Sequence, residues 1–487
     1  MDTKKLRQKI LDLAIHGKLV PQDPNDEPAS VLLERIRAEK ERLVKEGKIK
    51  KSKAAKTSDT PHYENVPFEV PSSWVWCKLG DIAYVASGST PSKESFVANG
   101  IPYIKMYNLR NQKIDFDFQP QYIKEEIHNG KLQRSRTEIG DLIMNIVGPP
   151  LGKLAIIPHS LPQANFNQAA VLIRPLQHKE ILVNYLFYYL SEMSEINSIS
   201  TKGSAGQVNI SLTQSQNMRI PLPPLTEQQR IVAEIDCWFT LINQIEQGKT
   251  NLQITIKQAK SKILDLAIHG KLVPQDPTDE PAFELLKRIN PKAEITCDNG
   301  HYQNLPKGWC TTSIKNICDN INGLWKGKKE PFINVGVIRN ANFTKDFKLD
   351  YSNIEYIDVE QRAFSQRHLK NGDLIIEKSG GSDNYPVGRA ILYEGKDELY
   401  SFSNFTMVLR IKDKNIITSK FLYYFLLDKY KKGVMRTMQT QTTGLHNLIL
   451  DKYLSMELCI PPYSEQKRII DAIEELFDKL DAIMESL

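Results

Sequence analysis

The sequence lacks the features that mark most membrane, secreted and nucleotide-dependent proteins. No apolar run approaches the roughly 20 residues of a membrane span, and the charged opening, MDTKKLRQKI, has no apolar segment of the kind found in secretion signals. Glycine-rich phosphate loops and the His-Glu-x-x-His metal pattern are also absent. We therefore expect a cytoplasmic protein that has no catalytic residues and binds no metal or cofactor itself.

Cysteine is scarce, with six among 487 residues and no Cys-x-x-Cys pair. Cys297, His301, Cys310 and Cys318 lie close together in the sequence, but their spacing fits no zinc-binding pattern known to us. Buried free thiols in a reducing compartment are the simpler interpretation. The net charge of +6 permits a polyanionic partner without requiring one.

One tetrapeptide resembles a catalytic motif. Ile-Pro-Pro-Tyr at 460–463 is similar to the [Asp/Asn/Ser]-Pro-Pro-[Tyr/Phe/Trp] motif of amino-methyltransferases, whose first residue accepts a hydrogen bond from the target amino group. Ile460 cannot accept one, and the corresponding Leu-Pro-Pro-Leu at 222–225 also lacks the aromatic residue. Both tetrapeptides precede an expected helix, so a role in starting the helix explains them better.

What the sequence does contain is an internal duplication. The fifteen residues ILDLAIHGKLVPQDP occupy 10–24 and again 263–277. Later segments correspond in the same order, among them GDLIMNIVG with GDLIIEKSG and PPLTEQQRIV with PPYSEQKRII. Two copies of one plan are therefore present.

The duplication predicts five regions. They are an N-terminal helical region with a basic linker (1–57), a first globular domain (58–222), a central region with a long helix (223–294), a second globular domain (295–460) and a C-terminal helix that pairs with the central one (461–487). Both globular domains should be mixed, with short strands such as 169–175 and apolar, aromatic-rich helices at 181–193 and 420–432 that form core. The basic segment 34–56 is interpreted as a solvated helix and linker, with a DNA-contacting arm as the alternative.

The central helix should extend from 227 to 269, with Thr226 as its N-cap and Gly270 ending it. Apolar residues recur along it at alternating steps of four and three, which predicts a packed seam, and the pattern continues in the C-terminal helix. The seam residues are Ile231, Ile235, Trp238, Ile242, Ile245, Leu252, Ile256, Ile263, Leu266, Ile469, Ile473, Leu476, Leu480 and Ile483.

The terminal helices together correspond to the central helix. The C-terminal helix matches its front part, and the first helix, with Leu6, Ile10 and Leu13, matches its back part. We expect the chain ends to meet and the helical units to pack antiparallel, in a pseudo-twofold, circular arrangement. A coiled-coil dimer between two chains is the alternative. His16 and His269, near the helix C-termini, should serve the scaffold.

These features resemble the specificity (S) subunits of type I restriction-modification enzymes. The resemblance rests on GKLVPQDPNDEPASVLLERIRAEKERLVKEGKIKK, on the two Pro-Pro helix starts and on the Trp–GDLI pattern, and it covers nearly the whole chain. It implies an α+β fold in which two mixed α/β target-recognition domains are joined by long antiparallel coiled-coil helices.

The resemblance also implies a function without catalysis by this chain. Each domain would read one half of an asymmetric, bipartite target in double-stranded DNA, and the helices would set the distance between the halves. Two modification (methyltransferase) subunits would dock on the helices and methylate adenines with S-adenosylmethionine. Restriction (helicase-nuclease) subunits would use ATP and Mg2+ to translocate and cleave DNA. No membrane partner is implied.

Four places in each domain are candidates for DNA contact, because they are polar, turn-rich or equivalently placed. They are the segments 87–93 and 322–328, the Arg-Asn pairs at 110 and 339, the loops after GDLI, and the segments 201–207 and 437–444. Solvated surface turns are the alternative. The candidate residues are Ser89, Thr90, Lys93, Arg110, Asn111, Lys153, Lys202, Ser204, Lys326, Lys328, Arg339, Asn340, Arg389, Gln439, Gln441 and Thr442.

Two other functions are compatible with the duplication. The chain could hold two adaptor domains on a coiled coil without binding DNA. A self-sufficient methyltransferase is disfavoured, because its cofactor and target motifs are missing.

Overall fold

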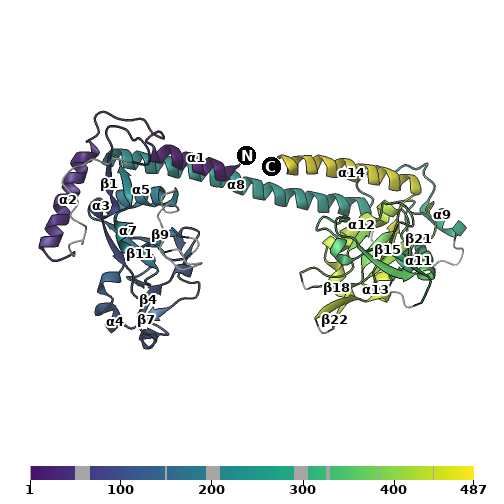
Figure 1. Ribbon diagram of the computed structural model, residues 1–487. Helices are drawn as coiled ribbons and strands as arrows, with labels where there is room; N and C mark the ends of the chain where they lie inside the picture. The colour runs from purple at the N-terminus through teal and green to yellow at the C-terminus, as the bar shows by residue number, and fades with distance from the viewer. Residues whose placement is uncertain are drawn as a thin grey trace. The chain divides into compact units, whose positions relative to one another are not determined.

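The computed structural model describes residues 2–49, 66–148, 151–192, 209–289, 305–324, 329–382, 384–442 and 444–487. The chain divides into two compact units, Met1–Gly248 and Lys249–Leu487 (Figure 1). Helix α8, Leu225–Ile268, begins in unit 1 and ends in unit 2. No helix in the described ranges combines the length and the apolar character that crossing a membrane requires.

Unit 1 contains two four-stranded sheets. In one, the strand order is β2-β11-β8-β9 with antiparallel neighbours, and in the other it is β10-β4-β7-β3 with β10 parallel to β4. The elements are α1 Thr3–Ile15, α2 Ala29–Lys45, β1 Val75–Lys78, α3 Leu79–Ile82, β2 Ala83–Ser87, β3 Phe96–Val97, β4 Ile101–Ile104, β5 Leu109–Arg110, β6 Lys113–Ile114, β7 Tyr122–Ile123, α4 Glu125–Asn129, β8 Leu142–Asn145, β9 Leu154–Ile156, β10 Asn165–Phe166, β11 Ala170–Pro175, α5 Lys179–Glu192, α7 Leu212–Gln216 and β12 Arg219–Leu222.

Unit 2 repeats this plan. Its main sheet has the order β14-β21-β17-β19, its second sheet β16-β15-β20, and a further sheet β18-β23-β22. The elements are α9 Ala282–Ile289, β13 Cys310–Ser313, α10 Ile314–Ile317, β14 Cys318–Asn322, β15 Phe332–Ile338, β16 Glu355–Glu360, α11 Gln361–Arg367, β17 Leu374–Glu377, β18 Ser379–Gly381, β19 Ala390–Leu392, β20 Tyr400–Phe402, β21 Thr406–Ile411, α12 Ser419–Lys431, β22 Gln439–Thr442, β23 Leu445–Leu448, α13 Leu450–Leu454, β24 Glu457–Ile460 and α14 Tyr463–Ser486.

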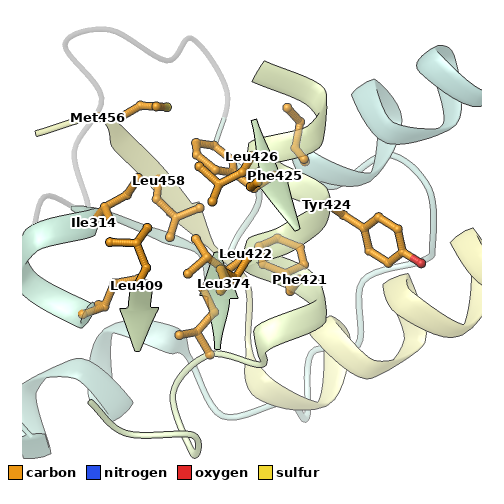
Figure 2. Packing of buried hydrophobic residues seen from close by; sticks show 14 of the residues in the cluster. Ile314, Leu374, Leu409, Phe421, Leu422, Tyr424, Phe425, Leu426, Met456 and Leu458 are labelled. Atoms are coloured by element: carbon orange, nitrogen blue, oxygen red, sulfur yellow. The ribbon is translucent and has the colours of Figure 1, made fainter. Parts of the chain in front are cut away.

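Each main sheet is buried on both faces. In unit 2, Leu374 faces a core that includes Phe421 and Leu422 of α12 (Figure 2), whereas Ile375 packs toward the second sheet with Phe402. Successive residues of a strand point to opposite faces, so an uninterrupted apolar run supplies both layers. The mixed fold and the core role of the two aromatic-rich helices are thereby confirmed.

A helix pair flanks the globular part of each unit. In unit 1, Arg7 of α1 donates to Asn243 at 2.7 Å, while Gln22, beyond α1, reaches Glu227 at the start of α8. In unit 2, Lys260 donates to Asp481 of α14 at 2.5 Å, and Gln275, beyond α8, donates to Glu465 at 2.6 Å. The residue numbers rise on one helix as they fall on its partner. Antiparallel packing is therefore confirmed within each unit, and the circular arrangement of the two units stays a prediction.

The predicted seam is only partly packed. Ile231, Ile235, Ile242, Ile256, Ile469 and Ile473 are buried, and Ile263, Leu266, Leu476 and Leu480 are half-buried. The expectation is wrong for four members, which are exposed: Trp238, Ile245, Leu252 and Ile483. The short helices α1 and α14 cover one side of α8 and leave apolar residues uncovered beside them.

The start of α8 also differs from the prediction. The helix begins at Leu225, so Thr226 lies in its first turn instead of capping it. The Thr226 hydroxyl donates to Asp26 of the preceding repeat, and Arg230 forms an ion pair with the same carboxylate at 2.6 Å. The Thr226 side chain thus contacts a residue that is distant in the sequence, instead of capping its own helix as predicted.

The repeated fifteen residues form a helix end followed by a tight exit turn. Gly17 and Gly270 adopt φ of +64°, and the next residue's N–H donates back to the last helical turn. A Cβ at Gly17 would lie 2.5 Å from Pro71 Cγ, and one at Gly270 2.4 Å from Pro306 Cγ. Only glycine tolerates both the backbone conformation and the close approach of the proline.

We predict that Gly17→Ala and Gly270→Ala each destabilise their own unit by more than about 1 kcal/mol, through the positive φ and the contact with proline. Gly248→Ala is the matched control, because Gly248 lies within α8 with nothing within 4 Å of an added Cβ. It should stabilise the chain by about 0.5–1 kcal/mol. Thermal unfolding of the three variants measures this, and equal shifts for all three would contradict the role of the exit turn.

Candidate nucleic-acid interface

In unit 2, residues from three of the four predicted places lie together, and the fourth joins them through the β22–β23 hairpin. Lys378, directly after β17, donates from Nζ to Asn322 Oδ1 at 3.1 Å, at the end of β14. Asn340 donates to the Ser379 carbonyl at 2.6 Å, and Ser379 Oγ donates to Asn447 Oδ1 at 2.7 Å. The resulting polar cluster is rich in amide groups. We call it the amide cluster: Asn322, Asn340, Lys378, Ser379 and Asn447.

The hairpin of β22 and β23 extends the amide cluster. Thr440 pairs with Asn447 across the strands, and Gln441 is exposed beside it. Gln439 accepts a hydrogen bond from the Val387 backbone at 3.3 Å, which fixes its side chain. Two exposed aromatic side chains, Tyr385 and Phe405, belong to the loops that hold β18. Amides with aromatic neighbours suit contact with base edges.

Unit 1 has a different surface at the corresponding level. Arg134 donates to Ser89 Oγ at 3.1 and 3.0 Å, and the Tyr103 hydroxyl donates to the Ser89 carbonyl. Thr90 and Lys93 are exposed on the same segment. In unit 1 the Arg134 guanidinium therefore lies at the turn of Ser89, where unit 2 has amide side chains.

Arg110 ends a run of cations and aromatic rings in unit 1. Its guanidinium lies 4.0 Å from the ring centre of the exposed Phe118, which meets Tyr107 edge-on. Lys105 lies over the rings of Tyr107 and Phe96. Because Phe96 packs on Tyr103, the run reaches Ser89. Stacked cations and rings of this kind can hold nucleobases or phosphates.

The Arg-Asn pairs at 110 and 339 do not correspond. Asn108 and Asn342 occupy the same structural place, since each accepts from the backbone N–H three residues earlier at 2.9 Å and donates to two carbonyls. The counterpart of Arg339 is therefore Lys105, and the predicted equivalence is wrong. The Arg-Asn dipeptide stands at the end of β5 in unit 1 but at the start of the 3-10 turn Asn340–Asn342 in unit 2.

The remaining candidates fall into three groups. Lys153 is exposed and Asn111 adopts a left-handed φ of 48° in the β5–β6 turn, so both can meet a ligand. Arg339 forms an ion pair with Glu355. Lys202, Ser204, Lys326 and Lys328 lie outside the described residues, and for Thr442 only the backbone in β22 is described.

Comparison with known proteins identifies the family. The type I restriction modification DNA specificity domain matches residues 71–255 and again 306–487. The chain belongs to this family. The two matches fall on the two copies of the duplicated plan, and they confirm the resemblance inferred from the sequence.

Relatives and solved structures agree with this assignment. The specificity subunits of the type I restriction enzymes EcoAI and EcoEI of Escherichia coli are 29% and 28% identical to this chain, over 97% and 99% of it and 88% and 90% of their own lengths. The HsdS subunit of Thermoanaerobacter tengcongensis has a similar fold, with a TM-score of 0.52 at 18% identity over 86% of this chain and 93% of its own. A chain from a structure of type I R-M complex assembly matches with a TM-score of 0.57 at 17% identity, over 86% and 94% of the two chains.

Arg389 is the candidate that turns inward within its specificity domain. Its Nε lies 3.2 Å from Glu377 Oε2, and its guanidinium lies over the Phe343 ring. Burial raises the pKa of Glu377, and the nearby Arg389 offsets part of that rise. The counterpart of this pair in unit 1 is Asn145 with the exposed Lys153, where the backbone makes the same contact. Arg389 therefore stabilises the domain and does not face a ligand.

We predict that Arg389→Met destabilises unit 2 by about 3 kcal/mol at neutral pH, because it leaves a buried carboxylate without a cation. The pKa of Glu377 would rise further above its unfolded value of about 4.3. A carboxyl shifted upward destabilises the fold only where it is ionised, so the loss should shrink as the pH falls through the folded pKa.

Thermal unfolding between pH 4.5 and 8 measures this effect. Lys153→Met, at the equivalent exposed position of unit 1, is the control and should leave the unfolding temperature unchanged. A loss for Arg389→Met that is the same at every pH would show that the ion pair is not its cause.

Proposed function

We propose that this chain is the DNA-recognition subunit of a type I restriction-modification enzyme. It binds a bipartite, asymmetric target, with one half-site for each unit, and directs adenine methylation and cleavage by partner subunits. It performs no catalysis itself. S-adenosylmethionine, ATP and Mg2+ are used by the partner subunits. The observation that carries the proposal is one architecture repeated in two units whose polar surfaces differ.

The repeated architecture supports a common task for the two units. The main sheets share one strand order, and the same ion pair, Arg230 with Asp26 and Arg468 with Asp279, fixes the repeat to the helix in both. The shared sheets and helix attachments therefore do not account for the different polar surfaces of the two units. Recognition of a split target requires two DNA-binding domains held by one scaffold.

The differing surfaces support different half-sites. Unit 2 presents the amide cluster with Thr440 and Gln441, whereas unit 1 presents Lys93, Arg134 and the run that ends at Arg110. Amide groups pair with adenine in the major groove, while arginine and lysine pair with guanine and with phosphates. Unequal chemistry on equal frames predicts an asymmetric target.

The decisive test is methylome sequencing of a host that expresses this chain with its partner methyltransferase. We expect methylated adenines in one split, asymmetric motif, because each unit reads its own half. Expression of the methyltransferase alone is the control and should give no such motif. A continuous palindrome, or no motif at all, would overturn the proposal.

The helices supply the surface for the methyltransferase partners. Unit 1 exposes Trp238, Leu241 and Ile245 on α8, which lie within roughly 60° of one another at about 100° per residue. Unit 2 exposes Leu252 on α8 and Ile483 on α14. Exposed apolar rows of this kind mark protein interfaces.

We predict that Leu241→Lys combined with Ile245→Lys weakens binding of the methyltransferase by at least about tenfold, because it places two charges in an apolar contact. Gln253→Lys is the control, since Gln253 is an exposed polar residue on the same helix. Titration of the purified chain with the methyltransferase measures both, and the unfolding temperatures should stay unchanged. Equal binding by the two variants would place the partner elsewhere.

A further inference from the structure

We propose that Lys378 contacts DNA at the half-site read by unit 2, through donation from its ammonium group to an acceptor on the duplex. The acceptor is a purine edge in the major groove or a backbone phosphate, which share this chemistry. The inference rests on the proposed function and adds to it a contact residue that directly follows strand β17.

The charge of Lys378 has no carboxylate partner in the described part of the chain. Its ammonium donates to Asn322 Oδ1, and the adjacent Glu377 turns to the opposite face of the strand, where Arg389 holds it. Lys378 is half-buried, and burial lowers the pKa of its ammonium group. Burying part of a cation beside only a neutral partner lowers the stability of the fold, unless an anion or a strong hydrogen-bond acceptor also contacts the cation.

The fold itself does not require a lysine here. In unit 1, GDLIMNI aligns with GDLIIEK, so the counterpart of Lys378 is Ile146, which is buried in the apolar core. The partner changes as well. Strands β2 and β14 are each followed by a glycine, Gly88 and Gly323, that lies so close to a backbone carbonyl that an added Cβ would be about 2 Å from it. These two glycines are therefore equivalent, and the residues before them, Ser87 and Asn322, are counterparts. Lysine and amide therefore appear together in one unit, on a frame that is stable without either.

The surroundings of Lys378 are those of a reading surface. Its backbone N–H and that of Ser379 both donate to the Phe405 carbonyl, which leaves the Phe405 ring exposed beside them. Asn322 is exposed, so a ligand can reach the ammonium group from its side and replace or join the amide. Asn340 and Asn447 hold β18 next to it.

Lys378→Ile tests the proposal, because isoleucine is the residue that unit 1 carries at this place. The complex of the chain with its methyltransferase is titrated with a duplex of the motif found by methylome sequencing, at several salt concentrations. We expect affinity to fall at least about fivefold. Lys378→Arg keeps the charge and should retain most of the affinity.

The two acceptors give different patterns. If Lys378 reads a base, Lys378→Ile relaxes the methylated motif at one position of one half-site and leaves the other half unchanged. If it contacts a phosphate, the motif is unchanged and the salt dependence of log K becomes less steep by about one.

Lys412→Met is the matched control. Lys412 follows the far end of β21 and, within the described ranges, likewise donates to neutral acceptors, the carbonyls of Lys315 and Asn316. It should leave affinity and motif unchanged. If Lys378→Ile folds and behaves like this control, the proposal fails. If the unaltered complex has no split motif, the proposed function fails first, so the two failures are distinguishable.

Discussion

Each unit depends on the junction between the repeated exit turn and the start of a long helix. Glycine packed on proline turns the chain, and a glutamine just beyond it reaches a buried carboxylate in the first turn of the helix, Glu227 in one unit and Glu465 in the other. Burial raises the pKa of both carboxyls. In unit 2, the Trp309 indole also donates to Glu465 at 3.0 Å. One side chain thus joins the repeat, the globular domain and the helix.

This junction explains why the fifteen-residue repeat is identical in the two units while the globular domains have diverged. Glu465 at this junction contacts both Gln275 of the repeat and Trp309 of the domain, so a substitution there disturbs both. Outside the junction, the same sheets tolerate different surfaces. Asp141 with Arg174 and Asp373 with Arg410 keep the sheet corner constant, at 2.6 and 2.7 Å. Around Ser89 and Asn322 the shared contacts are made by the backbone, since Gly88 and Gly323 each donate to the neighbouring strand, and the side chains there differ between the units.

Much of the fold could be predicted from the sequence, because duplication reveals which features a frame needs. The paired helices, the strands at 142–145 and 170–175, the aromatic-rich helices and the family all follow from patterns within the chain. Burial along α8 could not be predicted. Trp238 and Ile242 fit the same periodicity, yet one is exposed and the other buried, since periodicity does not distinguish a core from a surface kept for another molecule.

The candidate site was only partly predictable, for a different physical reason. Segments rich in polar residues could be selected, and in unit 2 the fold brings them together. Whether a cation faces inward is decided by tertiary contacts, and so Arg389, which looked like a ligand contact, is held by Glu377. Lys378 was missed because it continues an apolar strand, and its meaning appears only beside Asn322, 56 residues earlier. Comparison of the two copies, position by position, could have found it through its counterpart Ile146.

The identical exit turns have a consequence for how such a chain can change. Both globular domains meet the frame through the same glycine, proline and tryptophan, and through the same aspartate–arginine pair. A domain inserted between such a turn and the helix start that follows it would make these same contacts, whatever loops it carries. The two attachment sites are therefore interchangeable. New combinations of globular domains can arise by exchange of whole domains, without any adjustment of the helices that hold them.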